Sequence, residues 1–207
     1  SIELGKYDFF ESICLDRSLC FIYTLVLGYC MNSERADVAL IRCENYEAKK
    51  LDKAIETCAE IAGFPDIKGK TILIKPNVLN ASPASKAVTT NPAFVEAVIR
   101  FVKSRGAKEV LVGDSPGWQP VMLAAKTSGI YDAVQESGGT WVDFREVSPH
   151  PVAAGKKLKN IPLSSLLEQV DLVINLPKLK NHSLMTYTGA IKNLFGLIPG
   201  TAKSAMH

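Results

Sequence analysis

Residues 171–207 read DLVINLPKLKNHSLMTYTGAIKNLFGLIPGTAKSAMH, and this stretch decides both the fold and the site that we expect. Its opening DLVIN is a short apolar run that predicts a buried strand, and Pro177 ends the strand because proline cannot continue a central ladder. Beyond Asp171 the stretch contains no acid. Its cations, histidines and amides are Lys178, Lys180, Lys192, Lys203, His182, His207, Asn175, Asn181 and Asn193.

These polar residues follow the carboxyl end of a strand, where open α/β sheets place their ligands. Cations crowded so closely repel one another, so we expect an anion to bind among them. A solvated lysine-rich loop is the alternative explanation of the same charges.

The preceding sequence alternates between strand and helix patterns. Strands are predicted at residues 37–43, 71–75, 109–113 and 140–144, and helices at residues 47–62, 92–105, 119–137 and 163–170. Asn91 and Pro92 are typical of a helix start, and Gly129 is expected to split the third helix. Residues 147–162 hold three prolines and predict an extended or hairpin excursion. The alternation predicts an α/β fold, with a mainly parallel sheet and helices on both faces in a Rossmann-like, three-layer arrangement.

The composition limits the classes of function. All five cysteines lie within the first 58 residues and none forms a C-x-x-C pair, so no zinc or iron–sulfur site is expected within this chain. The absence of an evident disulfide framework predicts a reducing, cytoplasmic location. The net charge of +3 is modest, and without a recognised nucleic-acid module we expect no nucleic-acid partner.

The first thirty residues differ from the rest. Residues 19–30 form an apolar run shorter than the roughly 20 residues that a membrane helix needs, and the residues before it carry two basic and four acidic side chains, unlike a signal peptide. Met31 resembles a natural start. We expect residues 1–30 to be an upstream extension outside the native fold, and residues 31–207 to be one α/β domain truncated at its C-terminus. A packed helix or membrane-surface segment is the alternative for the extension, and no membrane partner is expected.

Polar residues also follow the earlier strands. The sequence GDSPG after residues 109–113 fits G-x-S-x-G, but Pro116 lacks the backbone N–H that a serine hydrolase needs after its nucleophile. Instead of a hydrolase site, we predict that these strand ends form a pocket for a carboxylate or phosphate compound. Its expected ligand-binding residues are Lys75, Asn77, Thr89, Thr90, Asp114, Ser115, Lys178, Lys180 and Asn193.

Five motifs together resemble a known family. They are KPNV from residue 75, TTNP from 89, GDSPG from 113, NLPKLKNH from 175 and TGAIKNLFGLIPG from 188. In this order, over residues 38–207, the chain resembles the family catalogued as domain of unknown function 362. Members of that family often carry or neighbour ferredoxin-like four-iron cluster segments. The resemblance therefore implies that the chain is part of a larger iron–sulfur-associated redox protein, with a ferredoxin-like domain or redox partner outside it.

A more distant similarity is to the N-terminal domain of nickel-pincer lactate racemases. That similarity implies His182 as the acid/base, Lys192 as the residue that carries the cofactor, and His207 as a metal ligand. The chain departs from the racemase pattern at residues 189–191, which read GAI instead of a double glycine before the lysine. GDSPG also stands where a second catalytic histidine is expected.

Two functions follow from these observations. The first is a cytoplasmic α/β domain that binds a small anionic ligand and serves a larger redox protein. The second is a stand-alone isomerase or racemase-like enzyme, with His182 as general base and Lys192 or a metal as electrophile. For His182, a buried or capping histidine is the structural alternative. The residues alone do not identify a cofactor.

Overall fold

A central, mainly parallel sheet organises the chain. The computed structural model describes residues 20–21, 25–27, 38–116, 120–152, 159–182, 186–200 and 203. Strand β4 (Thr71–Pro76) lies between β5 (Glu109–Val112) and β9 (Leu172–Leu176), both parallel to it, and β6 (Thr140–Trp141) adds a fourth parallel strand beyond β5. Every residue of β9 is buried, as is every residue of β4 after the first, which explains their continuous apolar sequences.

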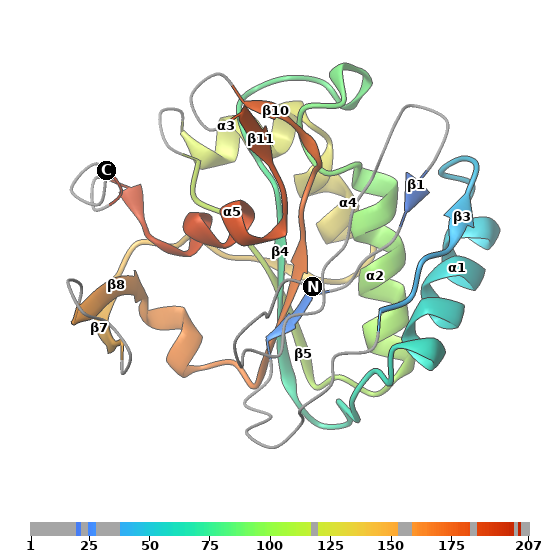
Figure 1. Ribbon diagram of the computed structural model, residues 1–207, viewed down its shortest axis with the longest axis horizontal. Helices are drawn as coiled ribbons and strands as arrows, with labels where there is room; N and C mark the ends of the chain where they lie inside the picture. Colours follow the sequence, from blue (N-terminus) through green and yellow to red (C-terminus); the bar gives the residue numbers. More distant parts are fainter. Residues whose placement is uncertain are drawn as a thin grey trace, which may run out of the picture.

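Three helices cover one face of the sheet (Figure 1). They are α1 (Ala48–Ile61), α2 (Pro92–Ser104) and α4 (Ile130–Glu136). The Asn91 side chain caps α2 by accepting a 2.9 Å hydrogen bond from the Ala93 amide, as its position before Pro92 predicts. Gly129, at a φ of 79°, separates α3 (Val121–Thr127) from α4.

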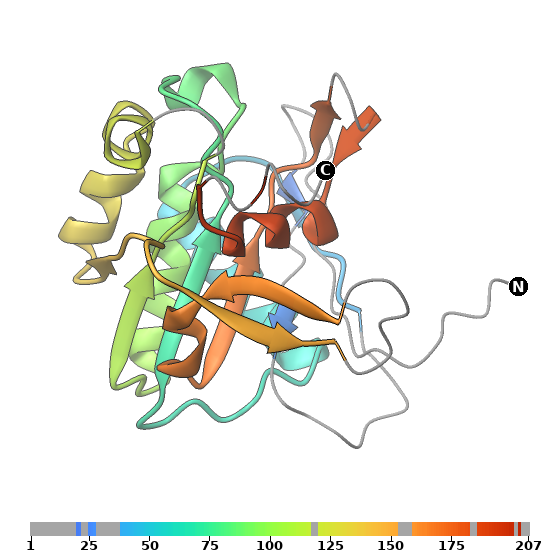
Figure 2. The same ribbon diagram turned by 90° about the vertical axis from the view of Figure 1, so that its left-hand side faces the viewer.

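The opposite face is covered by later segments of the chain. Because β9 lies on the other side of β4 from β5 and β6, a right-handed connection from β6 to β9 must cross this face. The connection comprises β7 (Val147–Pro151), β8 (Asn160–Ser164) and the 3₁₀ turn η2 (Ser165–Glu168). Figure 2 looks onto this face, with the β7–β8 hairpin and α5 (Ala190–Leu194) in front of the sheet. Leu73, Leu111 and Val173 of the sheet pack there against Phe144 and Leu197.

The expected α/β class is confirmed: a mostly parallel sheet lies between two covering layers. In the predicted excursion at residues 147–162, strands β7 and β8 pair antiparallel. Three local predictions were wrong in extent. The strand predicted at residues 140–144 is limited to β6, Thr140–Trp141. Of residues 38–43 only β3 (Arg42–Cys43) is a strand. The helix predicted at residues 163–170 is the single turn η2, because residues 163–164 pair with β7.

The upstream residues also pair with the fold in this structure. Strand β1 (Cys20–Phe21) pairs with β3, and β2 (Leu25–Leu27) pairs antiparallel with the outer edge of β9. Whether residues 1–30 belong to the native protein stays a prediction.

Candidate functional site

The candidate site lies where the order of the strands reverses. The chain passes from β4 to β5 on one side and later returns to β9 on the other, so the carboxyl ends of β4 and β9 form the switch point at which such sheets bind ligands. The hairpin of β10 (Lys180–His182) and β11 (Thr186–Thr188) stands at this end of the sheet, beside the loop that contains η1 (Ala84–Lys86) (Figure 1).

Lys75 and Asp114 form a buried ion pair at this edge. The Lys75 Nζ atom lies 2.6 Å from Asp114 Oδ1, and the two side chains are 0% and 4% exposed. The second carboxylate oxygen accepts a 2.7 Å hydrogen bond from the Val78 amide, and Oδ1 also accepts one from the Ser115 amide at 2.8 Å. Burial lowers the pKa of Lys75, and the Asp114 charge opposes that shift. Both predicted residues therefore reach the edge of the sheet, where they bind each other.

Three asparagine side chains form a chain of hydrogen bonds from β9 to β10. The Asn175 amide donates to the Ala190 carbonyl at 3.0 Å and accepts from Asn193 at 2.7 Å. Asn193 in turn accepts from Asn77 at 2.9 Å, and the Asn77 oxygen accepts from Lys180 Nζ at 2.6 Å. Every amide in the chain presents its oxygen toward Lys180. The chain thus fixes α5 and β10 against the ends of the central strands.

Lys180 is held by uncharged acceptors. Its ammonium group donates to Asn77 Oδ1 and to the Val88 carbonyl oxygen, and its side chain is half-buried. The pKa of Lys180 is lowered to about 8, chiefly by burial. The Asp114 charge opposes this shift, and the positive charges of Lys192, Lys178 and Lys75 contribute to it.

The other lysines of the predicted site gather around the same edge. Lys178 and Lys192 are half-buried and act electrostatically on Lys180. Burial lowers the pKa of Lys192. Lys203 donates to the Ser115 carbonyl oxygen, and its pKa falls to about 8, chiefly through burial. Asp114 is the one carboxylate that acts on Lys180 and on Lys203 among the described residues. We call Lys178, Lys180, Lys192 and Lys203 the lysine cluster.

The predicted hydroxyl residues divide into two kinds. Thr90 is fully engaged, because its hydroxyl donates to the Leu176 carbonyl at 2.7 Å and accepts from the Asn77 amide at 2.8 Å. The Ser115 hydroxyl accepts a 3.2 Å hydrogen bond from the Gly200 amide. Within the described residues, the Thr89 hydroxyl is buried without a hydrogen bond, and the same is true of Thr188.

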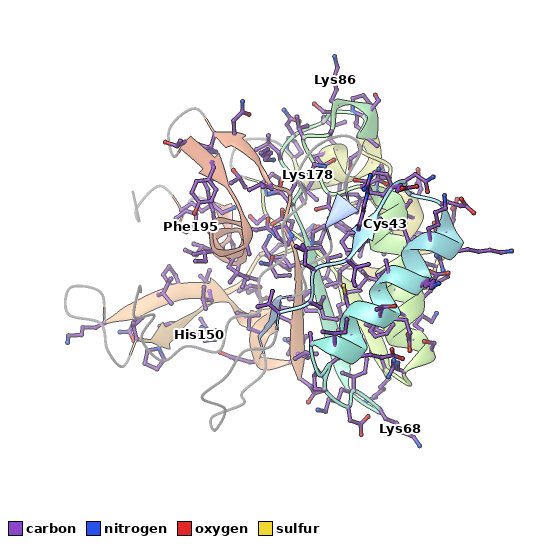
Figure 3. All side chains as sticks on the ribbon, turned by 45° about the vertical axis from the view of Figure 1, so that its right-hand side comes forward. Cys43, Lys68, Lys86, His150, Lys178 and Phe195 are labelled. Carbon is purple, nitrogen blue, oxygen red and sulfur yellow. The ribbon has the colours of Figure 1, made fainter. Side chains whose placement is uncertain are left out.

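The two histidines that the structure describes, His182 and His150, lie in different parts of the fold. His182 is half-buried at the end of β10, and burial together with the charges of Lys192 and Lys180 lowers its pKa. His207 lies outside the described residues. His150 is on β7, with Nδ1 3.1 Å from the Ser148 carbonyl oxygen, far from Lys178 (Figure 3). Among the described residues, no three His, Cys, Asp or Glu side chains are close enough together to hold a metal ion.

The predicted list of ligand-binding residues left out Asn175, Lys203, Thr188 and Gly196, although Asn175 and Lys203 stand among the polar residues of the stretch where an anion was expected. Asn175 was detectable, since it is the one polar residue between Leu172 and Leu176 in an otherwise apolar strand. Gly196 gave no signal: a Cβ atom there would lie 2.3 Å from Asp114 Oδ1 and 2.6 Å from Lys75 Nζ. The glycine therefore lets the η3 turn (Phe195–Leu197) lie directly on the ion pair.

Comparison with known proteins assigns a family without a reaction. Residues 72–207 match the family described as domain of unknown function (DUF362). The thylakoid-associated protein sll1697 of Synechocystis sp. is 33% identical over 173 residues, which are 82% of this chain and 53% of that protein. The chain thus spans about half the length of this relative. No solved structure matches the chain. None of the helices in the described ranges has the length and apolarity to cross a bilayer. With its family match covering well over half of its residues, the chain belongs to the DUF362 family.

Proposed function

We propose that this domain binds a small anion, a carboxylate or phosphate compound, at the lysine cluster. The observation that carries the proposal is an imbalance of charge. Asp114 is already paired with Lys75, and within the described part of the chain no other carboxylate acts on Lys180 or Lys203. A ligand with negative charge would supply the missing partner.

The energetics favour a ligand with more than one negative charge. Lys180 and Lys203 are withdrawn from water far enough to lower their pKa values to about 8, so gathering them as cations costs free energy. One negative charge would offset part of the repulsion among four ammonium groups, and two would offset more. We therefore expect dicarboxylates and hydrogen phosphate to bind more tightly than monocarboxylates.

Isothermal titration calorimetry at low ionic strength tests the proposal. The probes are inorganic phosphate, malonate and acetate, and the proteins are the wild type, Lys192→Met and Lys68→Met. Lys68 is the control, because it lies at the opposite end of the molecule from Lys178 (Figure 3). We expect phosphate and malonate to bind more tightly than acetate. Lys192→Met should lower the affinity for both anions by about tenfold, and Lys68→Met should leave it unchanged. Absence of binding by the wild type, or equal losses in both variants, would refute the proposal.

We also infer that the domain serves a larger iron–sulfur-associated protein in the cytoplasm. The support is the family resemblance, together with the relative's length, of which this chain matches about half. Electron paramagnetic resonance of the reduced full-length protein should give a cluster signal, and cell fractionation should place the protein away from membranes. The relative is named for its association with thylakoids, so recovery in a membrane fraction would instead favour a membrane-surface location.

A second candidate, an enzyme that moves a proton next to a carboxyl group, rests on His182. Burial, together with the positive charges of Lys192 and Lys180, lowers its pKa, which favours the neutral, basic form near pH 7. Deuterium exchange into 2-hydroxy acids in heavy water, followed by NMR, tests this function, with His182→Asn as the variant and His150→Asn as the control. Intact-mass measurement would detect an adduct on Lys192, and elemental analysis would detect a metal. An unmodified, metal-free protein that catalyses no exchange would exclude this candidate.

A further inference from the structure

The surroundings of Lys180 are more specific than a general excess of positive charge. A lysine ammonium group has three N–H donors. Two of them are directed to Asn77 Oδ1 and to the Val88 carbonyl oxygen, which fix the position of the nitrogen. One donor remains for a further acceptor, and the half-buried side chain retains some access to solvent.

Two buried hydroxyl groups belong to residues that adjoin the contacts of Lys180. Thr89 directly follows Val88, the residue whose carbonyl oxygen Lys180 contacts, and is 2% exposed. Thr188 is the partner of Lys180 in the β10–β11 pairing and is 3% exposed. Because directly opposed residues of an antiparallel pair project from the same face, the Thr188 side chain lies beside that of Lys180.

Neither hydroxyl has a hydrogen-bond partner among the described residues. Buried polar atoms are nearly always paired, so two unpaired hydroxyls on residues that adjoin the contacts of one lysine require an explanation. The loop itself does not account for the missing hydrogen bonds, since the hydroxyl of the neighbouring Thr90 both donates and accepts a hydrogen bond within the protein. An acceptor that arrives with a ligand would satisfy both groups.

We propose that Lys180, Thr89 and Thr188 form a subsite for the oxyanion head of the ligand, either a carboxylate or a phosphoryl group. This subsite rests on the proposed function and assigns its most specific contacts. The two hydroxyls and the third N–H of Lys180 all donate, so they match a group that carries only acceptors. Lys192, Lys178 and Lys203 then attract the ligand through charge, whereas the subsite fixes its orientation.

Isosteric substitutions separate hydrogen bonding from packing. Thr89→Val and Thr188→Val remove a hydroxyl and preserve the shape of the side chain, and Thr188→Ser keeps the hydroxyl. Ser148→Ala is the matched control, because the Ser148 hydroxyl is likewise buried and unpaired, on β7 away from the lysine cluster. Binding of inorganic phosphate and of malonate is measured by calorimetry, and thermal unfolding is followed for every variant.

We expect each valine substitution to lower the affinity for the preferred anion by about tenfold. Thr188→Ser and Ser148→Ala should bind it as tightly as the wild type does. The valine variants should unfold at the same temperature as the wild type or higher, because an unpaired buried hydroxyl has been removed. Preference for phosphate or for malonate identifies the head group. If the wild type binds an anion and both valine variants bind it equally well, the hydroxyls contact only water and the subsite is refuted, although the proposed function survives. If the wild type binds neither anion, the proposed function itself fails.

Discussion

The ammonium nitrogen of Lys75 lies 2.6 Å from the Oδ1 atom of Asp114, and the two side chains come from the ends of neighbouring parallel strands. Neither is accessible to a ligand, since Lys75 is 0% and Asp114 4% exposed. The pair is therefore a buried support of the site, and the ligand contacts that we propose come from the half-buried lysines of the cluster. Removing a side chain of this pair should therefore affect the stability of the protein more directly than it affects ligand binding.

Asp114→Ala should lower the free energy of unfolding by about 3–5 kcal/mol, because it leaves a buried ammonium group whose remaining acceptor is the Pro76 carbonyl oxygen. Urea denaturation measures the change. The double variant Lys75→Met/Asp114→Asn should lose less than Asp114→Ala alone, since no uncompensated charge is left in the interior. Arg145→Ala is the control: that arginine pairs with Asp143 at the surface, where such a pair contributes roughly 0–1 kcal/mol. Equal losses in Asp114→Ala and Arg145→Ala would contradict this account.

Gly196→Ala should destabilise the protein although it adds a single methyl group. The new Cβ atom would lie 2.3 Å from Asp114 Oδ1, so η3 must move away from the ion pair, at a cost of about 1–3 kcal/mol. Gly139→Ala is the comparison, because its nearest contact would be a Val134 methyl group at 3.2 Å, well beyond the 2.3 Å at Gly196. Thermal unfolding should show a clearly larger drop for Gly196→Ala. A tolerated Gly196→Ala would mean that the turn does not lie directly on the pair.

The sheet was predictable because its signals are local. The apolar runs of β4 and β9 indicate strands buried on both faces, and Asn91 with Pro92 marks the start of α2 within two residues. The hairpin β10–β11 was not predicted, because KNH and TYT lack the alternation of a half-buried strand. Its position depends on contacts distant in sequence, such as Lys180 with Asn77.

The site was predictable in location but less so in the role of each residue. Parallel strands bring their carboxyl ends to one edge, which is why Lys75, Lys180 and Lys192 lie close enough to interact electrostatically. Residue type alone does not reveal which polar groups bind one another. Lys75 and Asp114 are 39 residues apart in sequence, and their pairing follows from the register of β4 and β5. The ligand-binding roles of all the predicted site residues stay predictions.

Asn193→Asp should test the direction of the asparagine chain. The Asn193 amide nitrogen donates to Asn175 Oδ1 at 2.7 Å, and the carbonyl oxygens of Lys75 and Pro76 are 3.3 Å and 3.4 Å away. An aspartate would face these acceptors with a buried negative charge, which should raise its pKa and cost about 3 kcal/mol at pH 7. A carboxyl group with a raised pKa regains a proton as the pH falls, so the penalty should shrink between pH 7 and pH 4. Denaturation of both proteins across this range measures it, and a penalty independent of pH would show that the amide nitrogen does not face these oxygens.

Anion binding should weaken as the pH rises above about 8. The pKa values of Lys180 and Lys203 fall from 10.5 to about 8 in the free protein, and a bound anion favours the charged form and raises both values again. Well below pH 8 the two lysines are protonated with or without ligand, so their contribution to the affinity is constant. Between about 8 and 10.5 the ligand binds only with uptake of protons, so the affinity falls.

Calorimetry with phosphate or malonate at pH 8.5, in buffers of different ionisation enthalpy, measures this uptake directly. The observed enthalpy should vary with the buffer in the wild type and vary less in Lys180→Met, because one of the two protons is then no longer taken up. Lys68→Met, at the opposite end of the molecule, should retain the full dependence (Figure 3). In the free protein, burying the charged lysines costs stability below pH 8, and this cost should decrease as the pH rises toward 10.5. An enthalpy independent of the buffer, with affinity unchanged up to pH 10, would show that the anion does not contact Lys180 or Lys203.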